Sequence, residues 1–381
     1  MPIDFTQIPS PCYLLEEERL RNNLQLIKEV KERSGAEIIL AFKGFAMWSA
    51  FPVLNEFGFT QATASSLNEA RLAVEEMGSE AHTYAPVYTP EEFNQIIKLS
   101  SHITFNSLNQ YKRFYPMVKA SGKKVSLGLR INPEFSEVET DLYNPCAPGS
   151  RLGILAGELG PELPEGIDGL HFHALCESDS HDLEKVLNNF VERCWRYLPN
   201  LKWVNMGGGH LMTRKGYDVE FLISLIQRFK LAYPNIQVIL EPGSAFAWDT
   251  GYLVSTVMDI VENNGIKTAI LDVSFTAHMP DCLEMPYKPL VLGSLEPTEG
   301  KPTYRLGGNS CLAGDYMEFW SFEKELHIGD RIVFNDMIHY TMVKTTLFNG
   351  VQHPNIGIWN EKEGFRLVKH FEYQDFKGKL S

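Results

Sequence analysis

Lys43 stands where a lysine could do covalent chemistry. It directly follows the apolar run 38–42 and precedes Gly44, so its amine is expected at the end of a buried strand. Burial lowers the pKa of a lysine, and the neutral amine is the form that attacks an aldehyde. Lys43 is therefore a candidate for carrying an aldehyde cofactor, and a solvated loop lysine is the ordinary alternative.

Three further motifs end apolar runs in the same way. Glu241, in E-P-G, is a carboxylate whose burial without a partner is costly, and a protonated ring nitrogen is a suitable partner. The run 207–209 is G-G-G, which lets backbone N–H groups approach an anion closely. His173, in H-F-H-A, has a flat ring that can stack on another ring. Their ordinary alternatives are a buried salt bridge, a flexible turn and a core histidine.

Eight short apolar runs alternate with longer amphipathic segments between residues 37 and 242. This alternation is typical of βα units around a parallel sheet, and eight units predict a closed (β/α)8 TIM barrel, an α/β fold. Functional groups of such barrels gather at the carboxyl ends of the strands, so the four motifs above are expected at one mouth. The predicted strands are 37–42, 60–65, 82–87, 102–107, 124–131, 169–174, 203–208 and 237–242.

Two of the segments between these runs carry clear helix signals. SLNEARLAVEEMG begins with Ser66 and Glu69 at capping-box spacing and stops at Gly78. DVEFLISLIQRFKLAYP begins at Asp218, a favourable N-cap residue. Both segments are predicted to be helices that cover the barrel.

The alternation of apolar runs and amphipathic segments ends at about Trp248. Strand-like stretches without long helices between them follow, separated by Gly, Pro and Asn turns. They are GYLVSTVMDIV, KTAILDVS, DRIVFND and YTMVKTTLF. We expect a cofactor-binding barrel over residues 13–248 and an all-β domain over residues 249–381, the latter joined by an N-terminal strand within residues 1–12.

Composition narrows the function classes. The net charge of −13 disfavours nucleic acid and anionic membrane surfaces as partners and favours a cationic ligand. The six cysteines form no C-x-x-C pair, and the first residues do not resemble a secretion signal. No apolar run reaches the roughly 18 residues that a membrane span needs. We expect a cytoplasmic enzyme with no metal site.

The motifs become specific when they are taken in order. A-F-K-G, H-F-H-A, G-G-G, E-P-G, G-N-S-C-L-A-G-D and Y-T-M-V-K-T-T-L-F-N-G resemble the motif set of the fold-type III pyridoxal-phosphate decarboxylases, relatives of ornithine and diaminopimelate decarboxylase, from about residue 10 to about residue 350. The resemblance implies an alanine-racemase-like barrel with a C-terminal β-domain. HFHALCES, AHMPDCLEMPY and CLAGDY resemble most the carboxynorspermidine decarboxylase group, which implies decarboxylation of carboxynorspermidine or carboxyspermidine in polyamine synthesis.

The resemblance also implies roles for matching residues in binding pyridoxal 5'-phosphate. Lys43 would hold the cofactor, His173 would stack on its ring and Glu241 would pair with the ring nitrogen. The remaining cofactor contacts implied are Gly208, Gly209, Gly243 and Tyr340, of which Gly208, Gly209 and Tyr340 would bind the phosphate.

Other matching residues are implied to act on the substrate. Cys311 would return a proton to the α-carbon, and Asp315 would meet the amino end of the substrate. In the family this cysteine and its aspartate reach into the partner's site, which implies a homodimer with shared active sites. His278 and Asp281, a polar cluster in the β-domain, are further candidates for substrate binding, together with Glu241.

Some positions depart from the pattern of the relatives. Ser244 replaces the arginine of E-P-G-R, Thr63 replaces an aspartate of ornithine decarboxylase, and His173 opens H-A-L-C in place of H-x-G-S. These changes suit a subfamily with a longer substrate. The alternatives left open are a diaminopimelate- or ornithine-type decarboxylase, an amino-acid racemase of the same fold, and a non-catalytic regulator that binds the cofactor. The choice between the two carboxylated spermidines also stays open.

Overall fold

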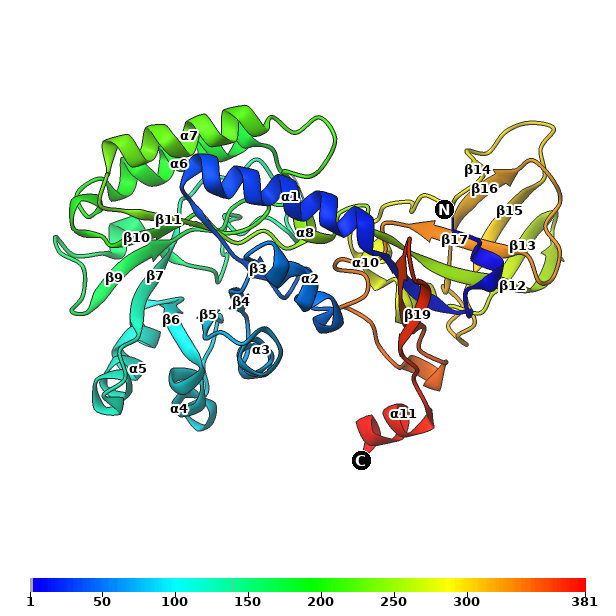
Figure 1. Cartoon of the computed structure of the whole chain (residues 1–381), viewed down its shortest axis with the longest axis horizontal. Coiled ribbons are helices and arrows are strands. Elements are labelled where there is room, and N and C mark those ends of the chain that lie inside the picture. Colours follow the sequence, from blue (N-terminus) through cyan, green and yellow to red (C-terminus); the bar gives the residue numbers. More distant parts are fainter. Residues whose placement is uncertain (1–2, 139) are drawn as a thin grey trace. The chain divides into compact units, whose positions relative to one another are not determined.

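The computed structural model describes residues 3–138 and 140–381 of the chain. It divides into two compact units, one formed by Asn23–Phe246 and the other by the residues up to Asn22 together with Ala247–Ser381. The first unit is built from parallel strands and helices, and the second mainly from strands (Figure 1). Each unit is described by itself below.

The first unit is a parallel barrel, as predicted. Every predicted strand range overlaps an observed strand, and the order around the sheet is β2-β11-β10-β9-β7-β6-β5-β4-β3. The strands are β2 (Glu37–Ile38), β3 (Leu40–Ala41), β4 (Ala62–Ala64), β5 (Ala81–Tyr84), β6 (Ser100–Phe105), β7 (Ser126–Asn132), β9 (Ile167–His171), β10 (Trp203–Asn205) and β11 (Gln237–Leu240). A short extra strand, β8 (Ile154–Leu155), pairs with β7.

The first predicted strand closes the barrel because it pairs with a neighbouring strand on each side. β2 pairs with β11, and β3 pairs with β4. Successive backbone N–H groups alternate between the two sides, since Ile39 donates to the carbonyl of Leu240 and Leu40 donates to that of Gln61. The two short pieces therefore act as one strand between the last and the second strand of the barrel.

Helices cover the barrel strands in Figure 1. Ser66 and Asp218 are the observed N-caps of α3 and α7, and Gly78 ends the first of these segments with φ of 75°. The helices are α1 (Glu17–Ser34), α2 (Phe51–Glu56), α3 (Leu67–Leu72) continued by η3 (Ala73–Met77), α4 (Pro90–Leu99), α5 (Leu108–Ser121), α6 (Ser180–Cys194), α7 (Val219–Ala232) and α8 (Ser244–Ala247). Short 3-10 turns are η2 (Trp48–Ala50), η4 (Ala156–Glu158) and η5 (Leu198–Asn200).

The prediction that a helix follows every barrel strand is wrong at one place. The described residues between β7 and β9 contain β8 and η4 but no α-helix. This stretch is rich in Pro and Gly, which favour turns over helices. The segment after β7 therefore forms an irregular loop at the carboxyl end of its strand, the end at which barrels place function.

Trp203 fills the interior of the barrel below that end. It contacts Ile39 and Ile239 on one side, and its ring lies 5.7 Å from the ring of His102 on the other. A Cβ built on Gly128 or Gly169 would overlap the indole. Only a side chain inside the barrel can touch so many strands, so two glycines in β7 and β9 make room for one tryptophan of β10.

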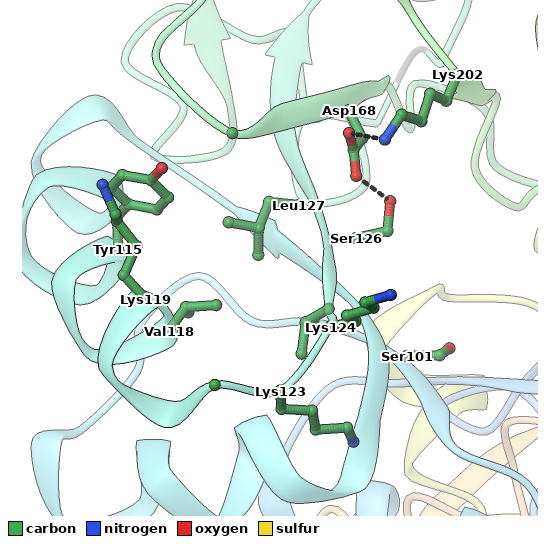
Figure 2. A pocket seen from close by; sticks show the side chains of 13 residues that line it. Ser101, Tyr115, Val118, Lys119, Lys123, Lys124, Ser126, Leu127, Asp168 and Lys202 are labelled. Carbon is green, nitrogen blue, oxygen red and sulfur yellow. Dashed lines mark hydrogen bonds and ion pairs between the residues drawn. The ribbon is translucent and has the colours of Figure 1, made fainter.

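The opposite, N-terminal end of these strands opens into a cleft of about 670 Å³ (Figure 2). Two of its lysines form ion pairs: Lys202 pairs with Asp168 at 2.7 Å, and Lys119 pairs with Glu165 at 3.0 Å. Asp168 also accepts a hydrogen bond from Ser126, whose hydroxyl in turn accepts one from the Trp203 indole. This polar network holds the tryptophan from below.

The second unit is a mixed sheet in the order β14-β16-β15-β13-β12-β1-β18-β19, with β17 paired to β12. The N-terminal segment contributes β1, which begins at Cys12; residues 3–11 contain η1 (Phe5–Gln7) and no strand. The strands are β1 (Cys12–Glu16), β12 (Gly251–Asn263), β13 (Ile266–Leu271), β14 (Ser294–Leu295), β15 (Thr303–Gly307), β16 (Tyr316–Phe322), β17 (Arg331–Asn335), β18 (Asn355–Asn360) and β19 (Gly364–Lys369).

Short helices interrupt this sheet, and one predicted strand is wrong. YTMVKTTLF forms turns, because Tyr340 has a positive φ of 30° and its carbonyl accepts hydrogen bonds from the N–H groups of Val343 and Lys344. The helices of this unit are α9 (Phe275–His278), α10 (Pro280–Glu284), α11 (Tyr373–Leu380) and the 3-10 turn η6 (Phe348–Gly350). Within the described residues, no helix has the length and apolar character to cross a membrane.

The contact between Trp203 and the two glycines makes a stability prediction. Gly169→Ala should destabilise the protein by about 1–3 kcal/mol, the usual cost of overpacking a core, because the new methyl overlaps the indole. Urea unfolding followed by circular dichroism measures the change. Gly157→Ala is the matched control, since a Cβ there meets nothing within 4 Å.

The same measurement in a Trp203→Leu background tests the cause. The cost of Gly169→Ala should shrink there, because the overlapping ring is gone. An equal cost in both backgrounds would contradict the steric explanation.

Candidate active site

Three polar side chains lie in one layer above Trp203. Arg130, His171 and Asn205 are register partners on β7, β9 and β10. Each stands two residues beyond Gly128, Gly169 or Trp203, and residues two apart on a strand share a face, so all three point into the barrel. All three are buried. Glu241, directly after β11, joins this layer at the carboxyl end of the strands.

Glu241 is a buried carboxylate with a defined set of neighbours. Its Oε1 accepts a hydrogen bond of 2.6 Å from Nδ2 of Asn205, and its Oε2 lies 3.6 Å from Nε2 of His171. Burial raises the pKa of Glu241, whereas hydrogen bonds from Asn205 and Thr63 and the charge of Lys43 oppose that rise. Thr63, where a relative carries an aspartate, therefore donates to Glu241 and adds no second negative charge beside it.

Lys43 enters the same mouth from the turn after β3. Nζ of Lys43 lies 3.1 Å from Nε2 of His173. The side chain keeps accessible surface at the open mouth, yet the barrel wall surrounds it and lowers the pKa of Lys43. The charge of Arg130 lowers that pKa further, and Glu241 acts in the opposite direction. Desolvation and a neighbouring cation thus favour the neutral amine.

His173 is held by the glycine turn after β10. Its Nδ1 accepts a hydrogen bond of 2.8 Å from the N–H of Gly208. Burial and the charge of Lys43 keep the pKa of His173 well below its usual value, so the ring is neutral. The hydrogen-bond network then assigns its one proton to Nε2, which faces Lys43. A hydrogen bond from this N–H requires a lone pair on Nζ, in agreement with a neutral Lys43 amine.

The glycines of the turn are required by packing. Gly207 and Gly209 have positive φ values of 71° and 90°. A Cβ on Gly207, Gly208 or Gly209 would meet a backbone carbonyl, that of Phe172, Glu241 or Leu175 respectively. Backbone therefore closes around this turn, and no side chain can enter it.

Gly243 has a similar constraint on the other side of the mouth. A Cβ on Gly44 would lie 2.8 Å from Cα of Gly243, so the turns after β3 and β11 touch backbone to backbone. This contact places the residue after Lys43 against the residue two beyond Glu241. Two glycines thus bring the amine and the carboxylate to one mouth.

Arg130 and His171 belong to this site but were not among the predicted site residues. Arg130 donates to the hydroxyl of Tyr84 at 2.7 Å and to the carbonyl of His173 at 3.1 Å. Tyr84 in turn donates to Oδ1 of Asn106 at 2.8 Å. The available signal was a charged residue inside the apolar strand GLRIN, and the first histidine of H-F-H, which shares a strand face with His173.

The residues of this mouth fit a flat aromatic aldehyde that carries an anionic group. Lys43 supplies an amine with a lowered pKa, His173 a neutral flat ring, and Glu241 a carboxylate beside the same space. The glycine turn lies next to His173, and its Gly208 N–H donates to Nδ1 of that ring. Each of these features is an observation on the barrel unit alone.

The other candidates lie in the second unit, close to one another. Cys311 is exposed, and its N–H donates to Oδ1 of Asn349 at 2.9 Å. Asp315 is buried, and its two oxygens accept hydrogen bonds from the N–H groups of Thr276 and Ser310, each 3.1 Å long. Asp315 therefore ties the loop that bears Cys311 to the start of α9.

The remaining candidates of that unit already have protein partners. His278 is buried, its Nδ1 accepts from the N–H of Ser274 at 3.0 Å, and burial lowers its pKa to about 3. Asp281 forms an ion pair of 2.7 Å with Lys344. Tyr340 lies in the turn that precedes Lys344. The structure thus brings together Cys311, Asp315, His278, Asp281 and Tyr340 in the second unit, and Lys43, His173, Gly208, Gly209, Glu241 and Gly243 in the barrel.

Comparisons with known proteins agree with this architecture. Carboxyaminopropylagmatine decarboxylase of Synechocystis sp. is 52% identical over 375 residues, which cover 98% of this chain and 96% of that protein. Carboxynorspermidine/carboxyspermidine decarboxylase of Campylobacter jejuni is 45% identical, and the match covers 98% of each protein. The crystal structure of carboxynorspermidine decarboxylase from Campylobacter jejuni, complexed with norspermidine, has a TM-score of 0.88 and covers 98% of this chain and all of that one.

The family model described as "Pyridoxal-dependent decarboxylase, C-terminal sheet domain" matches residues 18–338. The match includes both the strand ends that bear Lys43, His173 and Glu241 and the loop that bears Cys311. With full-length relatives at this level of identity, the chain belongs to the pyridoxal-dependent decarboxylases.

Proposed function

We propose that this protein removes the carboxyl group of carboxynorspermidine or carboxyspermidine, using pyridoxal 5'-phosphate held by Lys43. The observation that carries the proposal is full-length similarity to decarboxylases of these two compounds, at 45% and 36% identity. It is joined to a barrel mouth in which a lysine with a lowered pKa, a neutral histidine and a buried carboxylate meet. The acidic net charge of −13 suits a polyamine substrate.

Decarboxylation of the agmatine-derived analogue is a second candidate. It is favoured by the 52% identity to carboxyaminopropylagmatine decarboxylase. The three compounds share a carboxylated aminopropyl group on a secondary amine, and they differ at the far end, where agmatine carries a guanidinium in place of an ammonium. The reacting end is therefore the same for both candidates.

The bound cofactor supplies a π system that accepts the electron pair left by the departing carboxylate. Residues of the barrel hold it in this proposal: Lys43 through its amine, His173 against the ring and Glu241 at the ring nitrogen. Gly208, Gly209, Gly243 and Tyr340 complete the cofactor contacts.

The protonation states of the barrel residues suit these roles. Desolvation and the charge of Arg130 lower the pKa of Lys43 and so favour the form that reacts with an aldehyde. Asn205 and Thr63 donate hydrogen bonds that offset the desolvation of Glu241 and stabilise its charged form. Arg130 also fixes the carbonyl of His173, the residue whose ring faces Lys43.

The proton that replaces the carboxyl group comes from Cys311 in this proposal. Carbon dioxide leaves, the Cys311 thiol donates its proton to the α-carbon, and solvent returns a proton to the exposed sulfur. Asp315, Asp281 and His278 line the path of the amino end of the substrate. We propose a homodimer in which Cys311 and Asp315 of one protomer complete the site of its partner.

None of the six cysteines, all of which the structure describes, forms a disulfide. A proton donor at Cys311 requires a free thiol, which a reducing compartment preserves. We therefore propose that the enzyme works in the cytoplasm.

Replacing Arg130 by Met should raise the pKa of Lys43, because a neighbouring positive charge is removed. The apoprotein then needs a higher pH to present the neutral amine. The pH midpoint of pyridoxal 5'-phosphate uptake, followed by absorbance, should shift upward by about one unit. Arg151→Met is the control, since the charge of Arg151 acts on Tyr84 and not on Lys43. An unchanged midpoint in the Arg130 variant would contradict this account of Lys43.

Lys43→Ala should abolish covalent attachment of the cofactor. After borohydride reduction of the holoenzyme, mass spectrometry should find pyridoxal phosphate on the peptide that contains Lys43 in the native protein and no adduct in the variant. Cys311→Ala separates the two roles: it should keep the adduct and lose turnover about 100-fold, within the range for a missing proton donor. Attachment at another lysine would overturn the assignment of Lys43.

A substrate panel should show carbon dioxide release from carboxynorspermidine and carboxyspermidine. Diaminopimelate and ornithine should have kcat/KM values lower by about 10⁴-fold, because their ends leave buried polar groups of the site unpaired. Carboxyaminopropylagmatine in the same panel distinguishes the two candidate functions. Comparable turnover of diaminopimelate would exclude the proposal, and loss of optical activity without carbon dioxide release would indicate a racemase.

A further inference from the structure

His171 lies beside Glu241 in the barrel with no role assigned to it so far. We infer that His171 is a positioning residue that donates an N–H to Oε2 of Glu241 and so keeps this carboxylate ionised toward the nitrogen of the cofactor ring. The inference rests on the proposed function, because it concerns the carboxylate that faces the cofactor.

The geometry leaves one oxygen of Glu241 for His171. Nδ2 of Asn205 occupies Oε1 at 2.6 Å, whereas Oε2 has Nε2 of His171 as its neighbour at 3.6 Å. His171 and Asn205 are register partners on adjacent strands, so the backbone itself sets both donors against one carboxylate. A movement of less than 1 Å would turn the 3.6 Å contact into a hydrogen bond of ordinary length.

His171 is a buried histidine whose ring nitrogens need hydrogen-bond partners. It is 2% exposed, and both of its ring nitrogens lack a hydrogen-bond partner among the described residues. A buried polar group without a partner is costly, and native proteins rarely keep one without a use. Glu241 is the acceptor within reach of Nε2.

The surroundings select the neutral imidazole. Arg130 on β7 and Lys43 after β3 place positive charge near His171, and together with burial they hold the pKa of His171 well below its usual value. His173 lies two residues further along the chain, and the ring of Tyr84 on β5 meets that of His171 edge to face at 5.4 Å. A neutral ring carries one N–H, which Oε2 of Glu241 attracts to Nε2.

The consequence concerns the charge of Glu241. Burial raises the pKa of this carboxyl group, which favours its protonated form. A protonated carboxyl group no longer holds a proton on the ring nitrogen of a cofactor. An N–H from a neutral histidine stabilises the carboxylate and adds no further positive charge beside Lys43, which must stay neutral to react.

The test compares two substitutions of His171 in the holoenzyme. His171→Gln keeps an amide N–H near the place of Nε2, and His171→Leu removes the donor. The enzyme is loaded with pyridoxal 5'-phosphate labelled with ¹⁵N in the ring, and the chemical shift of that nitrogen is followed against pH. The ring nitrogen should lose its proton at a pH lower by about one unit or more in His171→Leu, and at the native pH in His171→Gln.

Kinetics give an independent readout. His171→Leu should lower kcat with little change in KM, since the substrate does not touch His171, and His171→Gln should restore most of kcat. A ring nitrogen that titrates at the native pH in His171→Leu overturns the inference. Unfolding in urea checks that both variants fold.

A second measurement on the otherwise native chain keeps the inference testable if His171→Leu does not fold. With ¹⁵N-labelled histidine, Glu241→Gln should move the Nε2 resonance of His171, and Glu69→Gln, a change at another carboxylate near Lys43, should not. Failure of the native protein to bind the cofactor on Lys43 would contradict the proposed function. If the native protein binds the cofactor but Glu241→Gln leaves the Nε2 resonance of His171 unmoved, only this inference is contradicted.

Discussion

The cost of burying a carboxylate governs the mouth of this barrel. Glu241 is 8% exposed, and a charged group with so little water must find donors in the protein. Asn205, Thr63 and His171 surround it from three different strands, and each is an uncharged side chain. Because these donors carry no charge, they add no cation beside Lys43, and Arg130 is the neighbouring cation that lowers its pKa. That arrangement keeps the amine of Lys43 reactive while the carboxylate stays beside it.

The layer below makes this arrangement possible. Trp203 occupies the space above Gly128 and Gly169, so Arg130, His171 and Asn205, two residues further along the same strands, share one level at the mouth. Ser126 holds the indole N–H at 2.9 Å and is itself held by Asp168. The polar layer of Arg130, His171 and Asn205 therefore packs above the Trp203 ring. These three residues are brought together by strand pairing and not by a loop.

Periodicity and capping were sufficient to predict the barrel strands and the helices that begin after Ser66 and Asp218. Lys43, His173, Gly208 and Glu241 were found because they follow apolar runs, which is where a barrel gathers its groups. Arg130, His171 and Asn205 were missed because a polar residue inside a strand looks like an exception to a pattern, and only pairing across strands shows that these three residues share a level. YTMVKTTLF was misassigned because β-propensity ignores the positive φ at Tyr340. The helix expected after β7 is absent from the described residues because the intervening sequence favours turns.

The packing of Trp203 against Gly128 and Gly169 couples three positions of the sequence. A larger side chain at either glycine of β7 or β9 needs a smaller one at the tryptophan of β10. A single replacement at one of these three positions therefore costs stability unless a second replacement accompanies it. Arg130 and Asn205, in the layer above Trp203, meet their neighbours through hydrogen bonds rather than through shape, so a replacement there needs no matching change in the Trp203 layer. The mouth of the barrel can therefore change its polar side chains while the contact between Trp203 and the two glycines stays intact.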